Sequence, residues 1–412
     1  MRSDTHSAVE SSGRLPLIGQ GPRPDAHQPP LLAIGFRPFF LLAALAALLL
    51  VPCWLFVLLT GSAWLGALPP ALWHAHEMLF GYTSAVIAGF LLTAVQNWTG
   101  QPSARGPLLL ALVVLWSAGR AVAFAGANLP AVLAAGIDLA FLPALALCVA
   151  RPIGRTRNTR NAGMPVLLLV LAAANGLYWA GSSMPDALAL LRGQRIALDV
   201  IAMLILVIGG RVIPGFTGNA VKGLSIRSRN ALDMLGVAAL AGLLVLDAAA
   251  PRSQAAAYGA ALAGLLNVLR LYGWGGARAL GRPILAVLHT GFACTALALL
   301  LRGYALATGA LTESTATHLL TVGGIGLMTL GMMARVALGH TGRQLTLHTS
   351  IVAAIAALAL SALVRVLGAV LVPHHYATVL IVAGALWALA FGLYLIHYTP
   401  ILIRPRVDGK LG

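Results

Sequence analysis

The run Phe39–Thr60 reads FFLLAALAALLLVPCWLFVLLT and contains no charged side chain. A helix of about 20 apolar residues crosses the roughly 30 Å hydrocarbon layer of a bilayer, and this run is long enough to do so. It is too long for the apolar segment of a signal peptide, and no small-residue cleavage site follows it. We therefore expect it to stay in the protein as a membrane anchor.

Further apolar runs of similar length follow along the chain. Prolines such as Pro130, Pro251 and Pro373 lie between them, as expected for residues that lack an amide donor and disfavour continued helix before them. The runs, with the first included, lie at 39–60, 72–96, 107–127, 130–150, 163–182, 192–213, 231–250, 255–274, 283–304, 317–340, 347–370 and 376–401. The sequence predicts an all-α, polytopic integral membrane protein with about twelve transmembrane helices in one bundle.

The composition agrees with a chain whose main solvent is lipid. Of the 412 residues, 59% are hydrophobic and 9% are charged, whereas soluble domains carry about 25% charged residues. Cys53, Cys148 and Cys294 lie singly within apolar runs, without the paired spacing of a disulfide or metal motif. We expect them to behave as small buried apolar residues.

The charged residues predict how the chain is oriented. Its 27 basic against 11 acidic residues would suggest a nucleic-acid partner in a soluble protein, but here the basic residues lie mostly between apolar runs. Retained cytoplasmic loops carry the excess of Arg and Lys, and the loops after even-numbered spans hold most of them, including Arg151, Lys222 and Arg343. Both termini should therefore be cytoplasmic, and no nucleic-acid partner is expected.

This orientation divides the chain into three parts. Residues 1–38 are polar and rich in proline and should form a flexible cytoplasmic N-terminal tail. Residues 39–403 should form the twelve-helix transmembrane domain, and residues 404–412 a cytoplasmic C-terminal tail. No long internal repeat is apparent in the sequence, and no pair of broken helices in matching halves stands out.

Ionisable side chains inside the apolar runs are candidates for function, because each costs at least a few kcal/mol in the bilayer. The densest cluster is Trp73-His74-Ala75-His76-Glu77, at the outer end of the second span. In a regular helix His74 and Glu77 share a face, while His76 points roughly 200° away from His74. One helical turn therefore cannot give both imidazoles to one metal. Either the segment begins extended, or each histidine serves a different partner; tight helix packing with interfacial histidines is the alternative.

Three more histidines within the apolar runs are candidates, whereas His348 and His397 lie near span ends and are assigned no site. His318 and His340 lie at the outer and inner ends of the tenth span, roughly 33 Å apart at 1.5 Å per residue, so they must serve different sites. His289, in the ninth span, lies nearer His340 by depth. The histidines thus divide into an outer group of His74, His76 and His318 with Glu77, and an inner group of His289 and His340 with Arg335.

Histidine is the commonest protein ligand for haem iron and copper. We expect metal ligands among His74, His76, His289, His318 and His340. Arg211 and Arg335 are candidate cofactor-binding residues, although arginines near a cytoplasmic end also snorkel toward water. Asp138 lies in the middle of a span, where an ion pair or an interhelical hydrogen bond is the simplest explanation. No phosphate-binding loop, nucleophile elbow or HExxH motif occurs in a usable context, which removes support for nucleotide or soluble-type hydrolysis.

Apart from His289, the candidate residues fall within strings that resemble the NnrS family of membrane proteins. The resemblance runs nearly end to end and rests on Gly35-Phe36-Arg37-Pro38-Phe39-Phe40, on Trp73 through Gly81, on Gly209 through Pro214, and on the tenth-span stretch from His318 through Gly339-His340-Thr341-Gly342-Arg343. It implies a bacterial inner-membrane protein that contains haem and copper and acts in nitric oxide metabolism, denitrification or protection from nitrosative stress. It implies no ligand assignment, so the candidate residues come from the geometry above.

Two mechanisms follow from this resemblance and the buried histidines. In the first, a haem b lies between helices, copper occupies a histidine site, and the pair binds or reduces nitric oxide with electrons from a donor such as a quinol. Glu77 is then the candidate catalytic residue, supplying protons at the outer surface. In the second, the protein is a transporter or sensor for metal, haem or nitrosylated iron that uses the same histidines without catalytic turnover.

Overall fold

The computed structural model describes residues 29–62, 68–125, 128–183, 186–221, 223, 224, 226 and 230–409. Within these ranges, twelve helical spans are long and apolar enough to cross a membrane, and no residue lies in a β-strand. The protein is therefore a polytopic all-α membrane protein, which confirms the fold class expected from the sequence. Most of the expected N-terminal tail, residues 1–28, lies outside the described residues.

The spans are numbered 1 to 12 along the chain, and several contain more than one helical segment. Spans 1 to 6 are α1 (Phe36–Thr60); α2 (Pro70–His76), η2 (Glu77–Thr83) and α3 (Ser84–Thr99); α4 (Gly106–Ala125); α5 (Ala131–Leu139) with α6 (Phe141–Arg155); η4 (Thr159–Asn161) with α7 (Gly163–Ser183); and α8 (Ala187–Ala220). Spans 7 to 12 are α9 (Asn230–Ala249); α10 (Gln254–Tyr272); α12 (Pro283–Thr308); α13 (Glu313–His318), η5 (Leu319–Gly326) and α14 (Leu327–His340); α15 (Thr349–Leu371); and η6 (Pro373–His375) with α16 (Tyr376–Ile403). Two short segments, η1 (Pro30–Leu32) and α11 (Gly276–Ala279), lie outside the spans.

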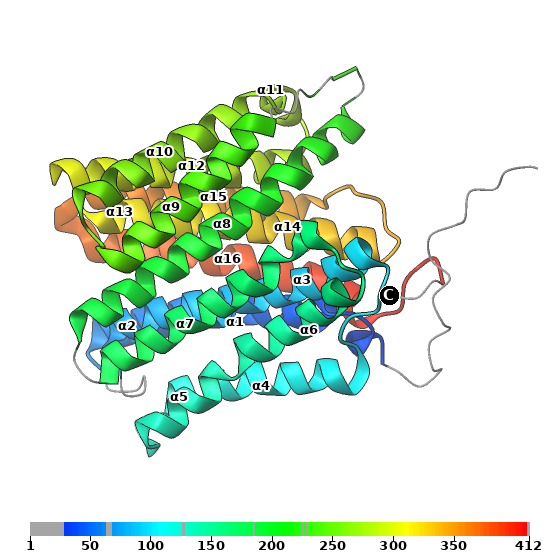
Figure 1. Cartoon of the computed structure of the whole chain (residues 1–412), viewed down its shortest axis with the longest axis horizontal. Helices are drawn as coiled ribbons and strands as arrows, with labels where there is room; N and C mark the ends of the chain where they lie inside the picture. The colour runs from blue at the N-terminus through cyan, green and yellow to red at the C-terminus, as the bar shows by residue number, and fades with distance from the viewer. Residues whose placement is uncertain are drawn as a thin grey trace, which may run out of the picture.

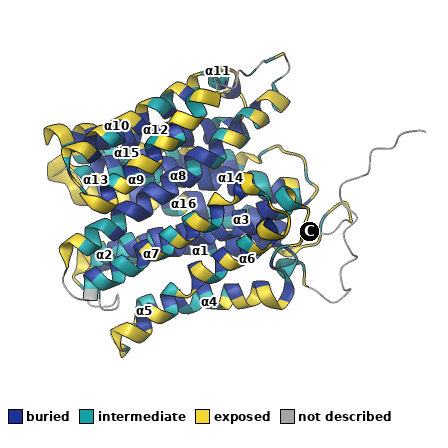
Figure 2. Ribbon diagram, viewed as in Figure 1, coloured by how far each residue is buried: buried dark blue, intermediate teal, exposed yellow. Residues whose placement is uncertain are grey.

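Every fourth span lies at the centre of the bundle. The most apolar stretches of spans 2, 6 and 10 are 78%, 67% and 72% buried, and no other span exceeds 61%. Residues from all three, including Ile87, Ile208 and Met332, line an apolar cavity of about 80 Å³ halfway along the bundle. The remaining spans surround these three, and their outward faces carry much of the exposed apolar surface (Figure 2).

The chain divides into three consecutive groups of four spans, and contacts between outer spans join one group to the next. α1 packs against α16, α6 against α7, and α10 against α12. These contacts connect span 1 with span 12, span 4 with span 5, and span 8 with span 9 (Figure 1). Spans 1–4, 5–8 and 9–12 therefore form three groups, and each group contributes one central span.

Spans 2 and 10 share one construction. Each opens with a short α-helix that ends in a histidine, continues as a π-helical segment, and finishes as an α-helix; π-helical segments are rare and are frequent at functional sites. The matched pairs, each separated by 242 residues, are His76 and His318, Gly81 and Gly323, Gly89 and Gly331, Thr99 and Thr341, and Gly100 and Gly342. The first and third groups thus repeat one plan in the same orientation. Sequence inspection missed this repeat because the matched residues are few and mostly small.

Both chain ends lie on one side of the bundle, since the number of spans is even. Arg37, at the start of span 1, donates from Nη1 to the Leu402 carbonyl at 2.7 Å, and Arg406 donates to the His340 carbonyl at 2.8 Å. Hydrogen bonds with Asp408 raise the pKa of Arg406. We call this the terminal side, and we call the opposite side, where spans 2, 10 and 12 begin, the distal side.

Candidate functional site

A cavity of about 290 Å³ lies in the distal half of the bundle, and we call it the distal cavity. Spans 1, 2, 6, 10, 11 and 12 line it with mostly apolar side chains. Its polar lining includes His74, His318, Arg365 and Tyr376. A mostly apolar cavity with a few convergent polar groups is the usual form of a small-molecule or cofactor site.

His74 reaches the distal cavity from α2. Its ring stacks on the indole of Trp54 in α1, with ring centroids 4.1 Å apart and planes inclined by 19°. Its Nδ1 is buried and has no hydrogen-bond partner among the described residues. A buried polar atom left without a partner costs about 1–3 kcal/mol, so the position of this ring is unfavourable by roughly that amount.

His318 faces the same cavity from the end of α13. Its Nδ1 lies 2.8 Å from the carbonyl oxygen of Ser314, one helical turn earlier. Because a carbonyl can only accept, Nδ1 carries the proton and Nε2 keeps its lone pair. Metal-binding histidines are commonly held in this way, with the second ring nitrogen donating to a carbonyl. The tautomer therefore leaves Nε2 as the atom that could bind a metal, in place of the contact that it makes with Arg365 Nη2.

Arg365, from α15, completes the polar part of the cavity. Its Nη2 lies 3.3 Å from His318 Nε2, 2.9 Å from the Tyr376 hydroxyl oxygen and 3.5 Å from Ser314 Oγ. The residue is only 6% exposed. The guanidinium thus brings a buried positive charge to the cavity that the two histidines share.

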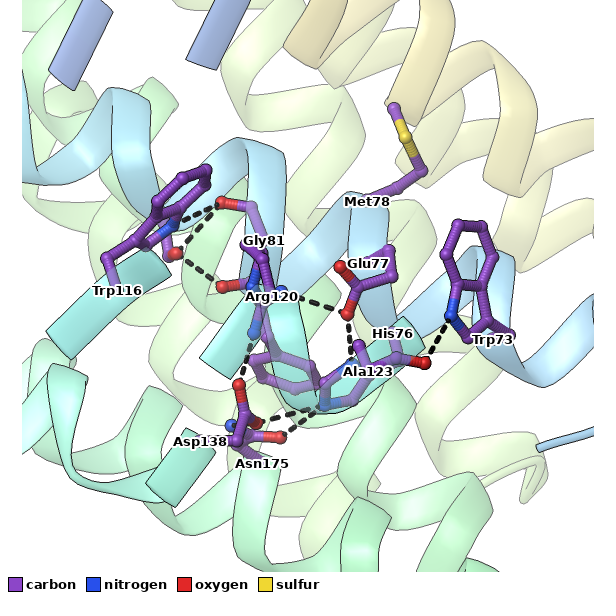
Figure 3. A network of polar contacts seen from close by, with 12 residues as sticks. Trp73, His76, Glu77, Met78, Gly81, Trp116, Arg120, Ala123, Asp138 and Asn175 are labelled. Carbon is purple, nitrogen blue, oxygen red and sulfur yellow. Dashed lines mark hydrogen bonds and ion pairs between the residues drawn. The ribbon is translucent and has the colours of Figure 1, made fainter. Parts of the chain in front are cut away.

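His76 points into a second polar cluster instead (Figure 3). Its Nδ1 lies 2.9 Å from Glu77 Oε1, and its Nε2 lies 3.0 Å from Asn175 Oδ1 and 3.2 Å from Asp138 Oδ2. Arg120 donates to Glu77 Oε1 at 3.0 Å and to Asp138. None of these five residues is more than 9% exposed. We call them the paired cluster; its ion pairs account for Asp138 in the way expected from the sequence.

The π-helical segment η2 begins within the paired cluster, at Glu77. In a regular helix Glu77 shares a face with His74, but in the structure its carboxylate bonds to the neighbouring His76 ring. A Cβ atom on Gly81 would lie 2.5 Å from Arg120 Nη1. Glycine at this position therefore leaves the space in which the guanidinium reaches both carboxylates.

The other two histidine candidates lie in the terminal half. His289 donates from Nδ1 to the Leu285 carbonyl at 3.1 Å, and its buried Nε2 has no partner among the described residues. The His340 ring contacts the Phe36 ring, with centroids 5.7 Å apart. Neither residue lines the distal cavity. The division into an outer and an inner group therefore stands, but His76 does not face the cavity that His74 and His318 share.

The two arginines expected to bind a cofactor also lie in the terminal half. The Arg335 guanidinium lies 3.7 Å from the centroid of the Phe216 ring, and both residues line a cavity of about 610 Å³ on the terminal side. Arg211 donates to Asn161 Oδ1 at 3.0 Å. Neither arginine contacts the distal cavity, so their role in binding a cofactor remains a prediction.

The donor sets fit a haem better than a copper ion. Among the described residues, no group of three or more His, Cys, Asp or Glu side chains is placed to hold a metal ion. This does not fit a copper centre built from three protein ligands. Haem iron needs only one or two axial side chains, and His74 and His318 line one cavity.

Sequence reasoning found both histidines of the distal cavity but missed Trp54, Arg365 and Tyr376. Arg365 carried a usable signal, because an arginine inside an apolar run is costly and calls for a partner. Trp54 and Tyr376 carried none, since aromatic residues near span ends are common in all membrane proteins. Their position depends on contacts between spans 1, 11 and 12, which are far apart in the sequence.

Comparison with known proteins gives one assignment. The family model described as NnrS protein matches residues 30–406, which include all twelve spans. No curated protein matches the chain.

Proposed function

The chain belongs to the NnrS family, and from that premise we propose that it binds a haem in the distal cavity and acts there on nitric oxide. Family membership supports a membrane protein related to nitric oxide. The observation that supports haem binding is that His74 and His318 line one mostly apolar cavity. His74 and His318 are the residues that would hold the haem, and a haem bound there would supply an iron able to take nitric oxide as a ligand.

The protein's own residues would orient and enclose the ligand. The stack on Trp54 fixes the plane of the His74 ring, and the Ser314 carbonyl fixes the tautomer of His318. The apolar lining, which includes Trp387, excludes water and keeps the local dielectric constant low. Nitric oxide is small and uncharged, so it loses little hydration free energy when it enters such a space.

Glu77 is proposed as the proton source for any reduction of nitric oxide. His76 Nε2 faces the Asn175 carbonyl oxygen, whose amide nitrogen in turn donates to Asp138 at 2.8 Å, so Nε2 carries a proton. The contact between His76 Nδ1 and Glu77 Oε1 therefore needs a second proton, shared between these two atoms. Glu77 itself does not line the distal cavity, but its neighbour in the chain, Met78, does.

The test is to purify the full-length protein in detergent, record its absorption spectrum, and measure iron and copper per chain. We expect a haem spectrum that shifts when nitric oxide is added. His74→Ala and His318→Ala should lose the haem, whereas His289→Ala and His340→Ala should retain it. A colourless protein free of iron would overturn the proposal, and copper measured in the same samples tests the second metal that the family resemblance implies.

Transport is a second candidate function, favoured by the matched π-helical segments of spans 2 and 10. Interrupted helices at corresponding positions of two repeats are the best pointer to a transport site. In this reading the distal cavity holds a passing metal complex or haem, and His74 and His318 bind it transiently. Uptake of haem or iron by liposomes that contain the protein, without any consumption of nitric oxide, would favour transport over catalysis.

We further propose that the protein lies in a bacterial inner membrane with its terminal side facing the cytoplasm. Arg151 and Arg155 lie exposed at the end of span 4, on the terminal side, where retained positive charge is expected. A C-terminal fluorescent protein should therefore be bright, and a C-terminal alkaline phosphatase should be inactive. The reverse pattern would contradict this orientation.

A further inference from the structure

Arg365 differs from every other arginine that is buried in the described part of the chain. Six arginines are buried there. Five of them satisfy their charge with carboxylates or backbone carbonyls. Arg37 donates to the carbonyls of Leu402 and Arg404, while Arg120 pairs with Glu77 and Asp138, Arg195 with Glu313, Arg270 with Asp233, and Arg302 with Asp199 and Asp247. Arg365 contacts only neutral groups.

The contacts of Arg365 all use one nitrogen atom. Nη2 is within hydrogen-bonding distance of His318 Nε2, Tyr376 and Ser314, whereas Nε and Nη1 bond to none of the described residues. Neither of these atoms is among the buried polar atoms sealed away without a partner. Since Arg365 lines the distal cavity, donors of a positive charge remain available to whatever fills it.

A buried charge without a counter-charge is costly in a membrane interior. Unpaired ionised groups pay several kcal/mol for lost hydration, and protein guanidinium groups cannot shed their proton to avoid it. Arg365 is 6% exposed, and no described carboxylate lies within ion-pair distance of it. An anion in the cavity would supply the charge that balances Arg365.

We propose that the distal cavity binds an anionic oxygen ligand at Arg365, through charge-assisted hydrogen bonds from its guanidinium. The chemical class is a carboxylate or small oxyanion, which guanidinium groups recognise most strongly. One source is a propionate of the proposed haem, and in that case the inference rests on the proposed function. The other source is a free small anion, and that case holds with or without a haem.

Tyr376 offers a second donor beside Arg365, and the positions of the two residues indicate which end of the cavity the anion occupies. Its hydroxyl oxygen accepts from Arg365 Nη2 at 2.9 Å, and its own proton stays available to a second acceptor. Both residues lie on the distal side, Arg365 in α15 and Tyr376 at the first position of α16. The anion should therefore occupy the distal end of the cavity, with the apolar part of the ligand deeper between the spans.

The experiment compares ligands that differ only in charge. The full-length protein in detergent, freed of cofactor, is titrated with haem b and with haem b dimethyl ester by quenching of tryptophan fluorescence. It is titrated with acetate and with nitrite by calorimetry. The variants are Arg365→Gln, Arg365→Lys and Tyr376→Phe, with the exposed Arg278→Gln as the matched control. Size-exclusion profiles and thermal unfolding show that each variant is folded.

Each source of the anion predicts its own result. If it is a propionate, wild type and Arg278→Gln bind haem about tenfold or more tightly than the ester. Arg365→Gln then removes this difference, and Arg365→Lys restores part of it. If the anion is free, haem and ester bind alike or not at all, but acetate or nitrite binds to wild type and not to Arg365→Gln. Equal affinities for haem and ester, together with no binding of either small anion, would overturn the inference. Failure of both haem forms with retained anion binding would overturn only the proposed function.

Discussion

The first and third groups of spans use the same arrangement for two purposes. In each, a histidine stands where a central span turns from α-helix to π-helix, and an arginine from the next span joins it: Arg120 near His76, and Arg365 beside His318. Around His76, the carboxylates of Glu77 and Asp138 balance the charges. Around His318 no described carboxylate is close, and the distal cavity opens. One scaffold therefore gives a cluster of paired charges in one copy and the proposed ligand site in the other.

The difference explains why a polar group can be either structural or functional at matched positions. In the paired cluster every charge has an opposite neighbour, so the cluster holds spans 2, 3, 4 and 5 together. In the distal cavity the protein supplies only neutral and positive groups to Arg365. A ligand must supply the rest, which is the expected state of a binding site before its ligand enters.

The largest expected effect separates the two arginines by stability. Arg120→Gln leaves two buried carboxylates without their cation, and breaking a buried pair in this way costs about 3–5 kcal/mol. Arg365→Gln strands no carboxylate and removes a buried charge that has no described counter-charge, so it should leave the stability of the ligand-free protein unchanged or raise it. Unfolding of both variants in detergent, followed by circular dichroism, measures the two changes. Equal losses would break the comparison.

Glu77 tests whether the paired cluster also serves the chemistry. Glu77→Gln keeps the size of the side chain and should leave the haem spectrum unchanged, while consumption of nitric oxide falls by about 100-fold or more, the usual contribution of a general acid. Glu313→Gln is the matched control, since Glu313 is a distal acid that pairs with Arg195 and Arg252. Full consumption by Glu77→Gln would leave the paired cluster a purely structural role.

Matched glycines sharpen the comparison at smaller cost. Gly81 and Gly323 occupy the same position in spans 2 and 10. In Gly81→Ala the new Cβ would lie 2.5 Å from Arg120 Nη1, so the guanidinium must move off a carboxylate, at about 1–3 kcal/mol. In Gly323→Ala it would meet Cys294 at 3.1 Å, which small shifts relieve. Thermal unfolding of the two variants should rank Gly81→Ala as the less stable, and the opposite ranking would count against a tight role for Gly81.

The fold was largely predictable because bilayer thickness dictates the length of each apolar run. All twelve expected runs correspond to spans, although several spans are longer than their runs, such as Ala187–Ala220 against 192–213. Helix length in the structure depends on packing against neighbours, which a hydropathy pattern does not contain. The grouping into three sets of four was not predictable in this way, since it depends on which spans are most enclosed.

The candidate site was predictable only in part. Burial cost alone singled out His74 and His318, because imidazoles inside apolar runs are rare whatever the fold. Placing Glu77 with His74 followed from regular helix geometry, but the Glu77 carboxylate bonds to His76 and to Arg120 of the next span instead. Arg365 was missed because its importance depends on having no carboxylate nearby. Which side chains of other spans lie near it is known only once the helices are packed.

The smallest effect concerns the contact between the two repeated spans themselves. Thr329, in span 10, donates its proton to the Ile325 carbonyl at 2.7 Å, so the Tyr82 hydroxyl of span 2 is the donor in its contact with Thr329. Tyr82→Phe removes one neutral buried hydrogen bond and should lower the free energy of unfolding by about 0.5–1.5 kcal/mol. Tyr394→Phe is the matched control, because the buried Tyr394 hydroxyl has no partner among the described residues, and its removal should be neutral or stabilising. Position 324, the counterpart of Tyr82 in span 10, is glycine, so span 10 has no equivalent hydroxyl to donate to span 2. A loss in Tyr82→Phe no larger than in Tyr394→Phe would show that packing, not this bond, holds the two central spans in register.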